Sequence, residues 1–273
     1  MTLFLQLLLG ALVSGIIYAL MAVGFNLVYR RTFSGDFLYG ISAIIALYLL
    51  YFFEKQFSVD GMLLLPAILF VVVILGIVGL LVDRYVYLPL EKRVGSGMSV
   101  FMLSFGIYFF IQWLISFLFG DQFKIYSFSL RSLDLPQFIR TEQLLVLLVG
   151  IGCLFIYFIL FENRQKAEKY NVFFGFMLAA VAGILYGIDM GFRPSTGLTL
   201  LLNGVAASIV AGPGKVRAGI FVAFLISIAE GFGTWQFDTN NKNMILFWFL
   251  ILSSFFVYRK TISQFLLFKT RKL

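Results

Sequence analysis

Long apolar stretches, separated by short polar or charged connections, run along almost the whole chain. A helix needs roughly 20 mostly apolar residues, within a range of about 17–25, to cross the hydrocarbon core of a bilayer. The pattern therefore predicts an all-α protein, a polytopic bundle of about nine membrane-spanning helices, at residues 3–29, 37–53, 61–82, 99–119, 143–161, 172–191, 197–212, 218–232 and 243–258. No soluble domain is left over, so residues 1–273 are expected to form a single transmembrane domain.

The basic residues between the stretches predict an orientation. Lys and Arg are enriched in the cytoplasmic loops of membrane proteins. With nine spans and the amino terminus outside, 15 of the 21 basic residues fall inside and 6 fall outside. The opposite orientation would reverse this distribution, so we expect the amino terminus outside, the carboxyl terminus inside, and a multi-pass protein of the cytoplasmic (inner) membrane.

The stretches at 197–212 and 218–232 are short, and Gly212, Pro213 and Gly214 interrupt the chain between them. They are either two short spans that meet at an inside turn or a pair that enters from outside and returns. The second arrangement would place Lys215 and Arg217 near the middle of the membrane, at a cost of several kcal/mol unless they are paired or hydrated. We therefore favour two short spans joined by a tight turn that needs glycine.

The composition agrees with a membrane protein and excludes several kinds of chemistry. Apolar and aromatic residues make up 61% of the chain and charged residues 12%, whereas soluble domains average roughly 45–50% and about 25%. The chain has no His and one Cys, which excludes catalytic His groups, His-bearing zinc sites and an internal disulfide. Val216 follows Gly214–Lys215 where a phosphate-binding loop needs Ser or Thr. We expect no enzyme activity, no metal and no cofactor.

Polar residues within or beside the spans are the candidate functional residues. Such groups are costly in a membrane and usually face the protein interior or a water-filled path. The candidates for a substrate pathway are Asn26, Asp36, Asn203 and Glu230. For each one, a purely structural hydrogen bond is the alternative. Asp83 and Arg84 can form a pair at the membrane interface, and Asp189 and Arg193, four residues apart, can pair across one helical turn.

Small residues recur at helical spacing in the first and sixth spans, which favours close packing between helices. The sequence Gly-Ile-Ile-Tyr at 15–18 also has a counterpart, Gly-Ile-Leu-Tyr, at 183–186. These two spans run in opposite directions in the expected topology. An inverted repeat, as found in many transporters, is the corresponding hypothesis.

Several motifs together resemble the membrane-permease subunits of ABC importers for branched-chain amino acids and for amides or urea. They occur in the family's order and cover most of the chain, at residues 8–29, 33–38, 83–90, 104–107, 119–120 and 211–219, with Glu230 in the following span. The resemblance implies a second homologous permease subunit, cytoplasmic ATPase subunits and an extracytoplasmic substrate-binding protein as partners, besides membrane lipid. Nucleic acid is not an expected partner.

One connection departs from the family pattern. The family has a long loop after the fifth span, with a short helix that docks on the ATPase, whereas residues 162–171 lead directly into the next span. Two hypotheses follow: an ABC importer subunit for branched-chain or other small amino acids or amides, or a permease-like protein without ATPase coupling that acts as a structural or regulatory partner. A stand-alone secondary transporter is less favoured because the spans hold few acidic residues. The expected partner contacts are the basic residues of the inside turns, Arg84, Lys92, Arg93, Arg164, Lys166, Lys215 and Arg217.

Overall fold

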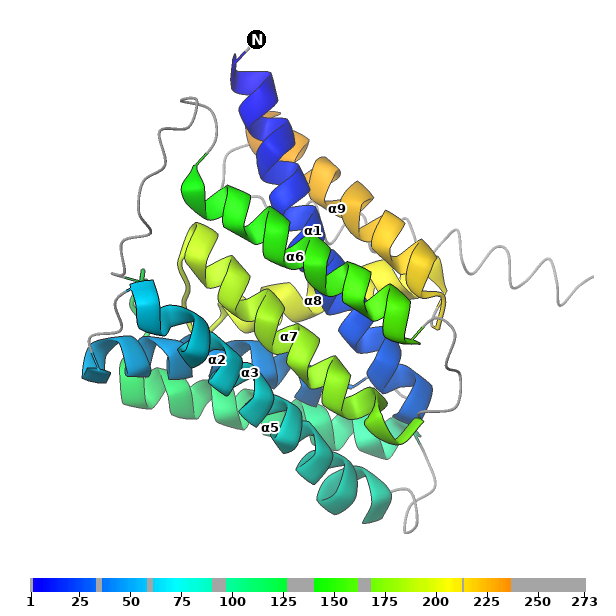
Figure 1. The fold of residues 1–273 in the computed structure, drawn as a ribbon. Coiled ribbons are helices and arrows are strands. Elements are labelled where there is room, and N and C mark those ends of the chain that lie inside the picture. Colours follow the sequence, from blue (N-terminus) through cyan, green and yellow to red (C-terminus); the bar gives the residue numbers. More distant parts are fainter. Residues whose placement is uncertain are drawn as a thin grey trace, which may run out of the picture.

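The computed structural model describes residues 2–32, 36–57, 61–89, 97–126, 140–161, 168–212 and 214–236. Within these ranges the chain is helical (Figure 1), apart from short connections and one isolated bridge between Lys124 and Phe192. The helices are α1 (Thr2–Thr32), α2 (Leu38–Phe57), α3 (Gly61–Val82), the π-helix η1 (Asp83–Tyr87), α5 (Gly97–Phe119), α6 (Thr141–Phe161), α7 (Glu168–Met190), α8 (Thr196–Ala211) and α9 (Val216–Gln236).

Seven of the helices in the described residues are long and apolar enough to cross a membrane. The prediction of a polytopic helical protein is confirmed. The predicted short span at 218–232 is wrong in length, because α9 runs over 21 residues and continues through the polar residues that flank this stretch. Among the apolar helices of the described residues only α8, with 16 residues, is short. The predicted span at 243–258 lies outside the described residues.

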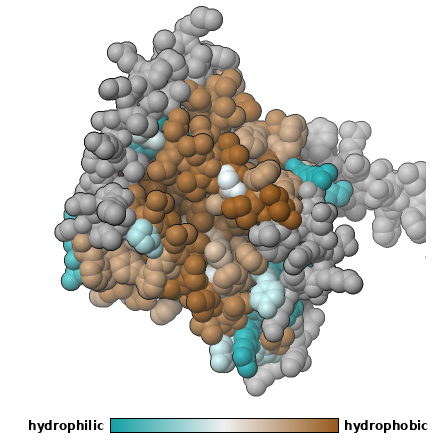
Figure 2. Space-filling model, viewed as in Figure 1, coloured by the Kyte–Doolittle hydropathy of each residue, from teal (hydrophilic) through white to brown (hydrophobic). Residues whose placement is uncertain are grey.

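Helix α1 is the central element of the bundle. It packs against α9, α7, α8 and α6, while α2 packs against α7, α3 and α5 (Figure 1). Helices α1 and α9 are antiparallel: Ser227 donates to the Ala11 carbonyl at 2.6 Å near one end, and the Gly214 amide donates to Asn26 Oδ1 at 2.7 Å near the other. On the face shown in Figure 2, the surface of the described residues is mostly apolar. It includes exposed aromatic residues on α5 and α6, such as Phe117 and Phe155, as expected for side chains that face lipid.

Glycine lets α1, α2 and α7 approach one another at the backbone. A Cβ atom on Gly24 would lie 2.9 Å from the Gly175 carbonyl oxygen, and one on Gly183 would lie 2.5 Å from the Ala43 carbonyl oxygen. Such contacts between backbones are typical of small-residue faces in membrane bundles. Of the predicted small-residue faces, Gly15 of the first span and Gly183 of the sixth lie in helix–helix interfaces, whereas a Cβ atom on Gly10 would meet nothing within 4 Å among the described residues.

The packing also has the arrangement of an inverted repeat. Helix α1 contacts α8 and α9, and α7 correspondingly contacts α2 and α3. Helices α1 and α7 are antiparallel, because Gly24 meets Gly175 toward one end and Tyr18 lies close to Tyr186 further along. The two halves, α1–α3 and α7–α9, thus have equivalent neighbours in opposite orientations. This agrees with the repeat suggested by residues 15–18 and 183–186.

Candidate functional site

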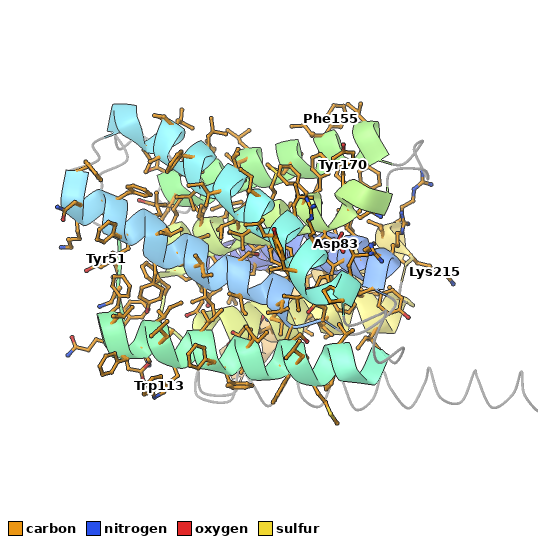
Figure 3. The ribbon with its side chains drawn as sticks, turned by 90° about the horizontal axis from the view of Figure 1, so that it is seen from below. Tyr51, Asp83, Trp113, Phe155, Tyr170 and Lys215 are labelled. Atoms are coloured by element: carbon orange, nitrogen blue, oxygen red, sulfur yellow. The ribbon has the colours of Figure 1, made fainter. Side chains whose placement is uncertain are left out.

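The ends of the bundle separate the charged residues into two groups. At one end, Arg30 donates to the Gly214 carbonyl at 2.9 Å, and Arg31 Nε lies 3.3 Å from Asp83 Oδ1; we call this the Arg30 end. At the other, which we call the Lys124 end, Lys124 pairs with Phe192 through both backbone hydrogen bonds, at 2.9 Å. Tyr51 and Lys215 lie at opposite ends of the molecule (Figure 3).

Between the two ends, four polar side chains from four helices form a mostly buried group, which we call the central cluster: Tyr18, Tyr186, Asn203 and Glu230. The Tyr18 hydroxyl donates to Glu230 Oε2 at 2.6 Å. Tyr186 lies close enough to that hydroxyl to interact with it electrostatically, and the Asn203 side chain lies within hydrogen-bonding reach of it. Asn203 is 0% exposed and Glu230 is 4% exposed. The expectation that Asn203 and Glu230 face the protein interior is correct.

The helices hold this cluster in place through close packing. Tyr18 lies about halfway along α1. One turn before it, a Cβ atom on Gly15 would lie 2.5 Å from the Phe224 ring of α9, so only glycine lets the two helices approach this closely. One turn before Glu230, Ser227 binds the α1 backbone. These contacts fix the distance between Tyr18 and Glu230.

Asn203 differs from the other buried polar groups near it. Among the described residues, neither its amide nitrogen nor its carbonyl oxygen has a well-formed hydrogen bond, although the Tyr18 hydroxyl lies close by. More than about 90% of buried polar groups in folded proteins are hydrogen-bonded, so an exception requires an explanation. A hydrogen bond to the Tyr18 hydroxyl of the neighbouring helix α1, the structural alternative for this residue, is within reach of the Asn203 side chain.

Asn26 is not part of the central cluster. It lies eight residues beyond Tyr18, about 12 Å along an α-helix. Its side chain accepts from the Gly214 amide, and its Nδ2 donates to the Ala22 carbonyl at 2.9 Å and to Ser208 at 3.1 Å. Gly212 and Gly214 have φ values of 91° and 88°. Asn26 therefore holds a turn that does require glycine, and the structural alternative applies to it.

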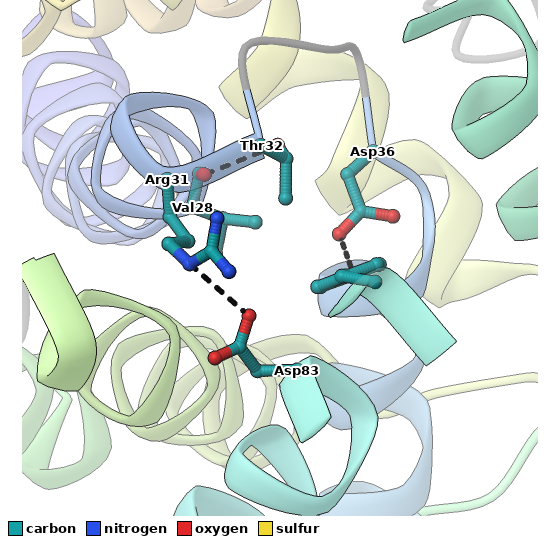
Figure 4. Close-up of polar contacts among 6 residues, drawn as sticks. Val28, Arg31, Thr32, Asp36 and Asp83 are labelled. Carbon is teal, nitrogen blue, oxygen red and sulfur yellow. Dashed lines mark hydrogen bonds and ion pairs between the residues drawn. The ribbon is translucent and has the colours of Figure 1, made fainter. Parts of the chain in front are cut away.

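Asp36 also lies apart from the central cluster, at the Arg30 end. The Tyr87 hydroxyl of η1 donates to Asp36 Oδ2, and the Leu38 amide donates to Oδ1 at 2.9 Å. Figure 4 shows Asp36 near the ion pair between Arg31 and Asp83. Burial raises the pKa of Asp36 to about 6, and these hydrogen bonds limit the increase. Together with the Arg31–Asp83 pair, this contact connects η1 to both sides of the segment between α1 and α2. Asp83 thus pairs with Arg31 on another helix and not with Arg84, its expected partner.

The expected pair between Asp189 and Arg193 is also absent, because each of the two side chains has another partner. Asp189 Oδ1 lies 3.5 Å from Arg140 Nη2, and Arg193 lies over the Phe123 ring. The reason is that α7 ends at Met190 and Gly191, with φ of 71°, turns the chain away from the helix axis. Residues 189 and 193 therefore do not lie one turn apart on a single helix.

Of the predicted partner contacts, Arg84, Lys215 and Arg217 are exposed near the Arg30 end. Lys92, Arg93, Arg164 and Lys166 lie outside the described residues. In the described part of the chain, no three His, Cys, Asp or Glu residues form a group that could hold a metal ion. Tyr18 and Tyr186 were not among the predicted site residues, although a tyrosine hydroxyl in mid-span needs a polar partner and both occur in the repeated motif.

More than nine-tenths of the chain aligns with relatives of one kind. It is 24% identical to the high-affinity branched-chain amino acid transport system permease protein BraD of Pseudomonas aeruginosa, over 91% of this chain and 92% of the relative. It is 25% identical to the probable branched-chain amino acid transport permease protein LivH of Methanocaldococcus jannaschii, over 96% and 88%. It is 25% identical to the Escherichia coli LivH protein, over 91% and 92%.

The chain is a distant, full-length homologue of these permeases. These relatives are transporter permease subunits and not enzymes, and seven described helices of the chain are long and apolar enough to cross a membrane. No protein-family model matches the chain, and no solved structure matches it.

Proposed function

We propose that this chain is the transmembrane subunit of an ABC importer that moves branched-chain or other small amino acids, or amides, across the cytoplasmic membrane. The full-length homology to relatives named as branched-chain amino acid permeases carries this proposal. The central cluster supports it, because buried polar residues halfway through a membrane bundle are typical of substrate pathways. Of the four predicted pathway residues, Asn203 and Glu230 belong to this pathway, whereas Asn26 and Asp36 have structural roles at the Arg30 end.

The proposed assembly contains a second homologous permease subunit, ATPase subunits on the inside and an extracytoplasmic substrate-binding protein. The Arg30 end faces the cytoplasm, the Lys124 end faces outward, and the chain spans the membrane nine times with its amino terminus outside. The support is the positive-inside rule, together with the grouping of Arg30, Arg31, Arg84, Lys215 and Arg217 at one end.

The Arg30 end is suited to pass movement from an ATPase to the pathway. The last residues of α1 bind two turns of different kinds: Arg30 binds the glycine turn at Gly214, and Arg31 binds the helical turn of η1 at Asp83. Helix α1 also carries Tyr18, and α9, which begins just after Gly214, carries Glu230. A displacement of either turn therefore moves the two helices whose side chains meet in the central cluster, and packed helices transmit such displacements as discrete shifts.

The connection between α6 and α7 is too short to add a separate docking helix. Helix α6 ends at Phe161 and α7 begins at Glu168, which leaves six residues, 162–167. Six residues would form only about 9 Å of helix. Coupling in the proposed importer therefore runs through residues 83–98 and 212–217. The same short connection favours the alternative, a permease-like partner subunit that has lost ATPase coupling.

The deciding experiment is co-purification with the products of neighbouring genes in mild detergent, followed by reconstitution and an ATPase assay. The importer predicts ATP hydrolysis that L-leucine or L-valine stimulates in the presence of the binding protein. A stable complex in which none of a panel of amino acids and amides stimulates hydrolysis would support the alternative. Failure to recover any ATPase subunit would refute the importer.

The orientation has its own test in intact cells. In a Cys153→Ser background, Lys55→Cys and Arg84→Cys place one thiol at each end of the bundle on exposed positions. A membrane-impermeant maleimide should label the Lys55→Cys variant in intact cells and the Arg84→Cys variant only after the cells are opened. Labelling of the Arg84→Cys variant in intact cells would refute the proposed orientation and support the opposite one.

A further inference from the structure

Helix α8 has one narrow apolar face that the described part of the chain covers only in part. Leu198, Leu202, Val205 and Ile209 lie on it, and we call them the α8 stripe. Leu202 is 37% exposed and Ile209 is 45% exposed, whereas the other residues between 200 and 208 are buried. We infer that the predicted span at 243–258, which lies outside the described residues, packs along this stripe and parallel to α8. The inference rests on the nine-span topology of the proposed function.

The spacing of the α8 stripe is that of a contact between two helices. Its residues follow one another at intervals of four, three and four positions, which is the spacing at which one helix packs along another. Helix α9 carries a second exposed set at the same intervals, which we call the α9 stripe: Phe221, Leu225, Ile228 and Phe232. Spacing alone therefore leaves two faces on which the span at 243–258 could lie.

The inverted repeat decides between these two faces. Helices α8 and α9 correspond to α2 and α3, and the first half of the chain continues with α5, which packs mainly against α2. These two helices are parallel. The Phe37 ring, at the start of α2, lies 5.4 Å from the Phe101 ring, and the Tyr48 ring lies 5.0 Å from the Phe119 ring further along. The span that follows α9 in the second half is therefore expected against α8, and parallel to it.

The side chains of the two stripes agree with this assignment. The α9 stripe has phenylalanine at both ends, and Phe221 is 65% exposed, like the aromatic residues of α5 and α6 that face lipid. The α8 stripe consists of leucine, valine and isoleucine, and Leu198 and Val205 are already half-buried against the bundle. Aliphatic side chains of this size are typical of the seam between two packed helices.

The chain can reach α8 and run in the required direction. Helices α8 and α9 form a hairpin around Gly212 and Gly214, and with 16 and 21 residues they are about 24 Å and about 30 Å long. The start of α8 and the end of α9 therefore both lie at the Lys124 end. The six residues 237–242 extend over about 20 Å, whereas the axes of packed helices are about 8–10 Å apart.

The proposed contact has consequences at both levels of the bundle. A span that starts at the Lys124 end and runs beside α8 finishes at the Arg30 end, where the positive-inside rule also places the five basic residues of 259–273. Asn203 of the central cluster follows Leu202 on α8. With the span on the α8 stripe, α8 is held between α1, α2, α9 and that span, which separates the helix that carries Asn203 from lipid.

Disulfide cross-linking of the full chain tests the contact. In the Cys153→Ser background, Leu202→Cys is combined in turn with one cysteine at each position of 243–258. The purified protein is placed in lipid nanodiscs and oxidised with copper phenanthroline. A protease site introduced into residues 237–242 then allows the two fragments to separate on a denaturing gel unless a disulfide joins them. Leu225→Cys on the α9 stripe, where the side chain is 42% exposed, is the matched control.

The Leu202→Cys series should form disulfides at positions three or four residues apart, because only one face of a helix meets the stripe. Moving the first cysteine to Leu198, one turn earlier on α8, should move the reactive positions by about four toward residue 243, because parallel helices keep their order. The Leu198→Cys series also decides the question if the Leu202→Cys variants do not fold. The Leu225→Cys series should leave the fragments separate.

Several results would overturn the contact. Joined fragments in the Leu225→Cys series would place the span on the α9 stripe, and disulfides between two chains would make the α8 stripe a contact between copies. Reactive positions that move toward residue 258 in the Leu198→Cys series would make the helices antiparallel. Equal reaction at every position, or none at any, would remove the contact.

The outcome is independent of transport, because the assay needs neither ATP nor a substrate. Periodic disulfides in a protein that fails the leucine-stimulated ATPase test retain the contact and refute the importer. The reverse pair of results refutes the contact alone.

Discussion

The close contact between α7 and α2 allows a direct test of the packing. A Cβ atom added at Gly183 would lie 2.5 Å from the Ala43 carbonyl oxygen and 2.8 Å from its Cα. Both are backbone atoms, so no side-chain rotation relieves the clash, and Gly183→Ala must push the helices apart. Overpacking of this kind costs about 1–3 kcal/mol. Replacing glycine by alanine within a helix recovers roughly 0.5–1 kcal/mol, so the net loss of stability should be about 1–2 kcal/mol.

Gly106→Ala is the matched control for this change. Gly106 lies within α5, and a Cβ atom there would meet nothing within 4 Å among the described residues. The control should therefore be neutral or slightly stabilising. Thermal unfolding in detergent, followed by thiol-reactive dye at the single cysteine Cys153, measures both variants. At about 2–4 °C per kcal/mol for a chain of this size, Gly183→Ala should unfold a few degrees lower than the unsubstituted chain.

An unfolding temperature of Gly183→Ala equal to that of Gly106→Ala, or higher, would refute the contact. Such a result would mean that the backbones of α2 and α7 do not meet at this level. The pairing of α7 with α2, on which the inverted repeat depends, would then lose its main support.

Three further changes test the Arg30 end. The pKa of Asp36 rises from 3.8 to about 6 in the folded protein, so the stability that its protonated form contributes is present below pH 3.8 and is lost as the pH rises through 6. Asp36→Asn should flatten the unfolding temperature between about pH 4 and 7, and an unchanged profile would contradict the assignment. Gly214→Val should cost about 1 kcal/mol or more because its φ is positive, whereas Gly214→Asn should be milder; equal unfolding temperatures would contradict the strain. Arg31→Asp should lower ATPase coupling in the reconstituted complex. The double variant, Arg31→Asp with Asp83→Arg, should restore part of that coupling. Coupling in the double variant no higher than in Arg31→Asp would argue against the Arg31–Asp83 ion pair.

The long apolar helices could be predicted from the residues alone. Hydropathy and length are local properties. In a bilayer, the backbone N–H and C=O groups of a spanning helix must form hydrogen bonds within that same segment. The described helices therefore follow the predicted stretches closely, and the glycine turn at Gly212 and Gly214 could be identified from residue type. The observed helix ends differ from the predicted ones where polar residues continue a helix, as in α9. The apolar pattern did not indicate the π-helix Asp83–Tyr87.

Which polar residues lie together depends on how the helices pack. Asn26, Asp36, Asn203 and Glu230 look alike in the sequence, since each is a polar group within or beside an apolar stretch. The packing of α1 against α8 and α9 brings Asn203 and Glu230 to Tyr18, while it gives Asn26 and Asp36 partners at the Arg30 end. The physical reason is that the cost of a buried polar group depends on what lies opposite it. In a helical bundle, the opposite group comes from a helix that is distant in the sequence.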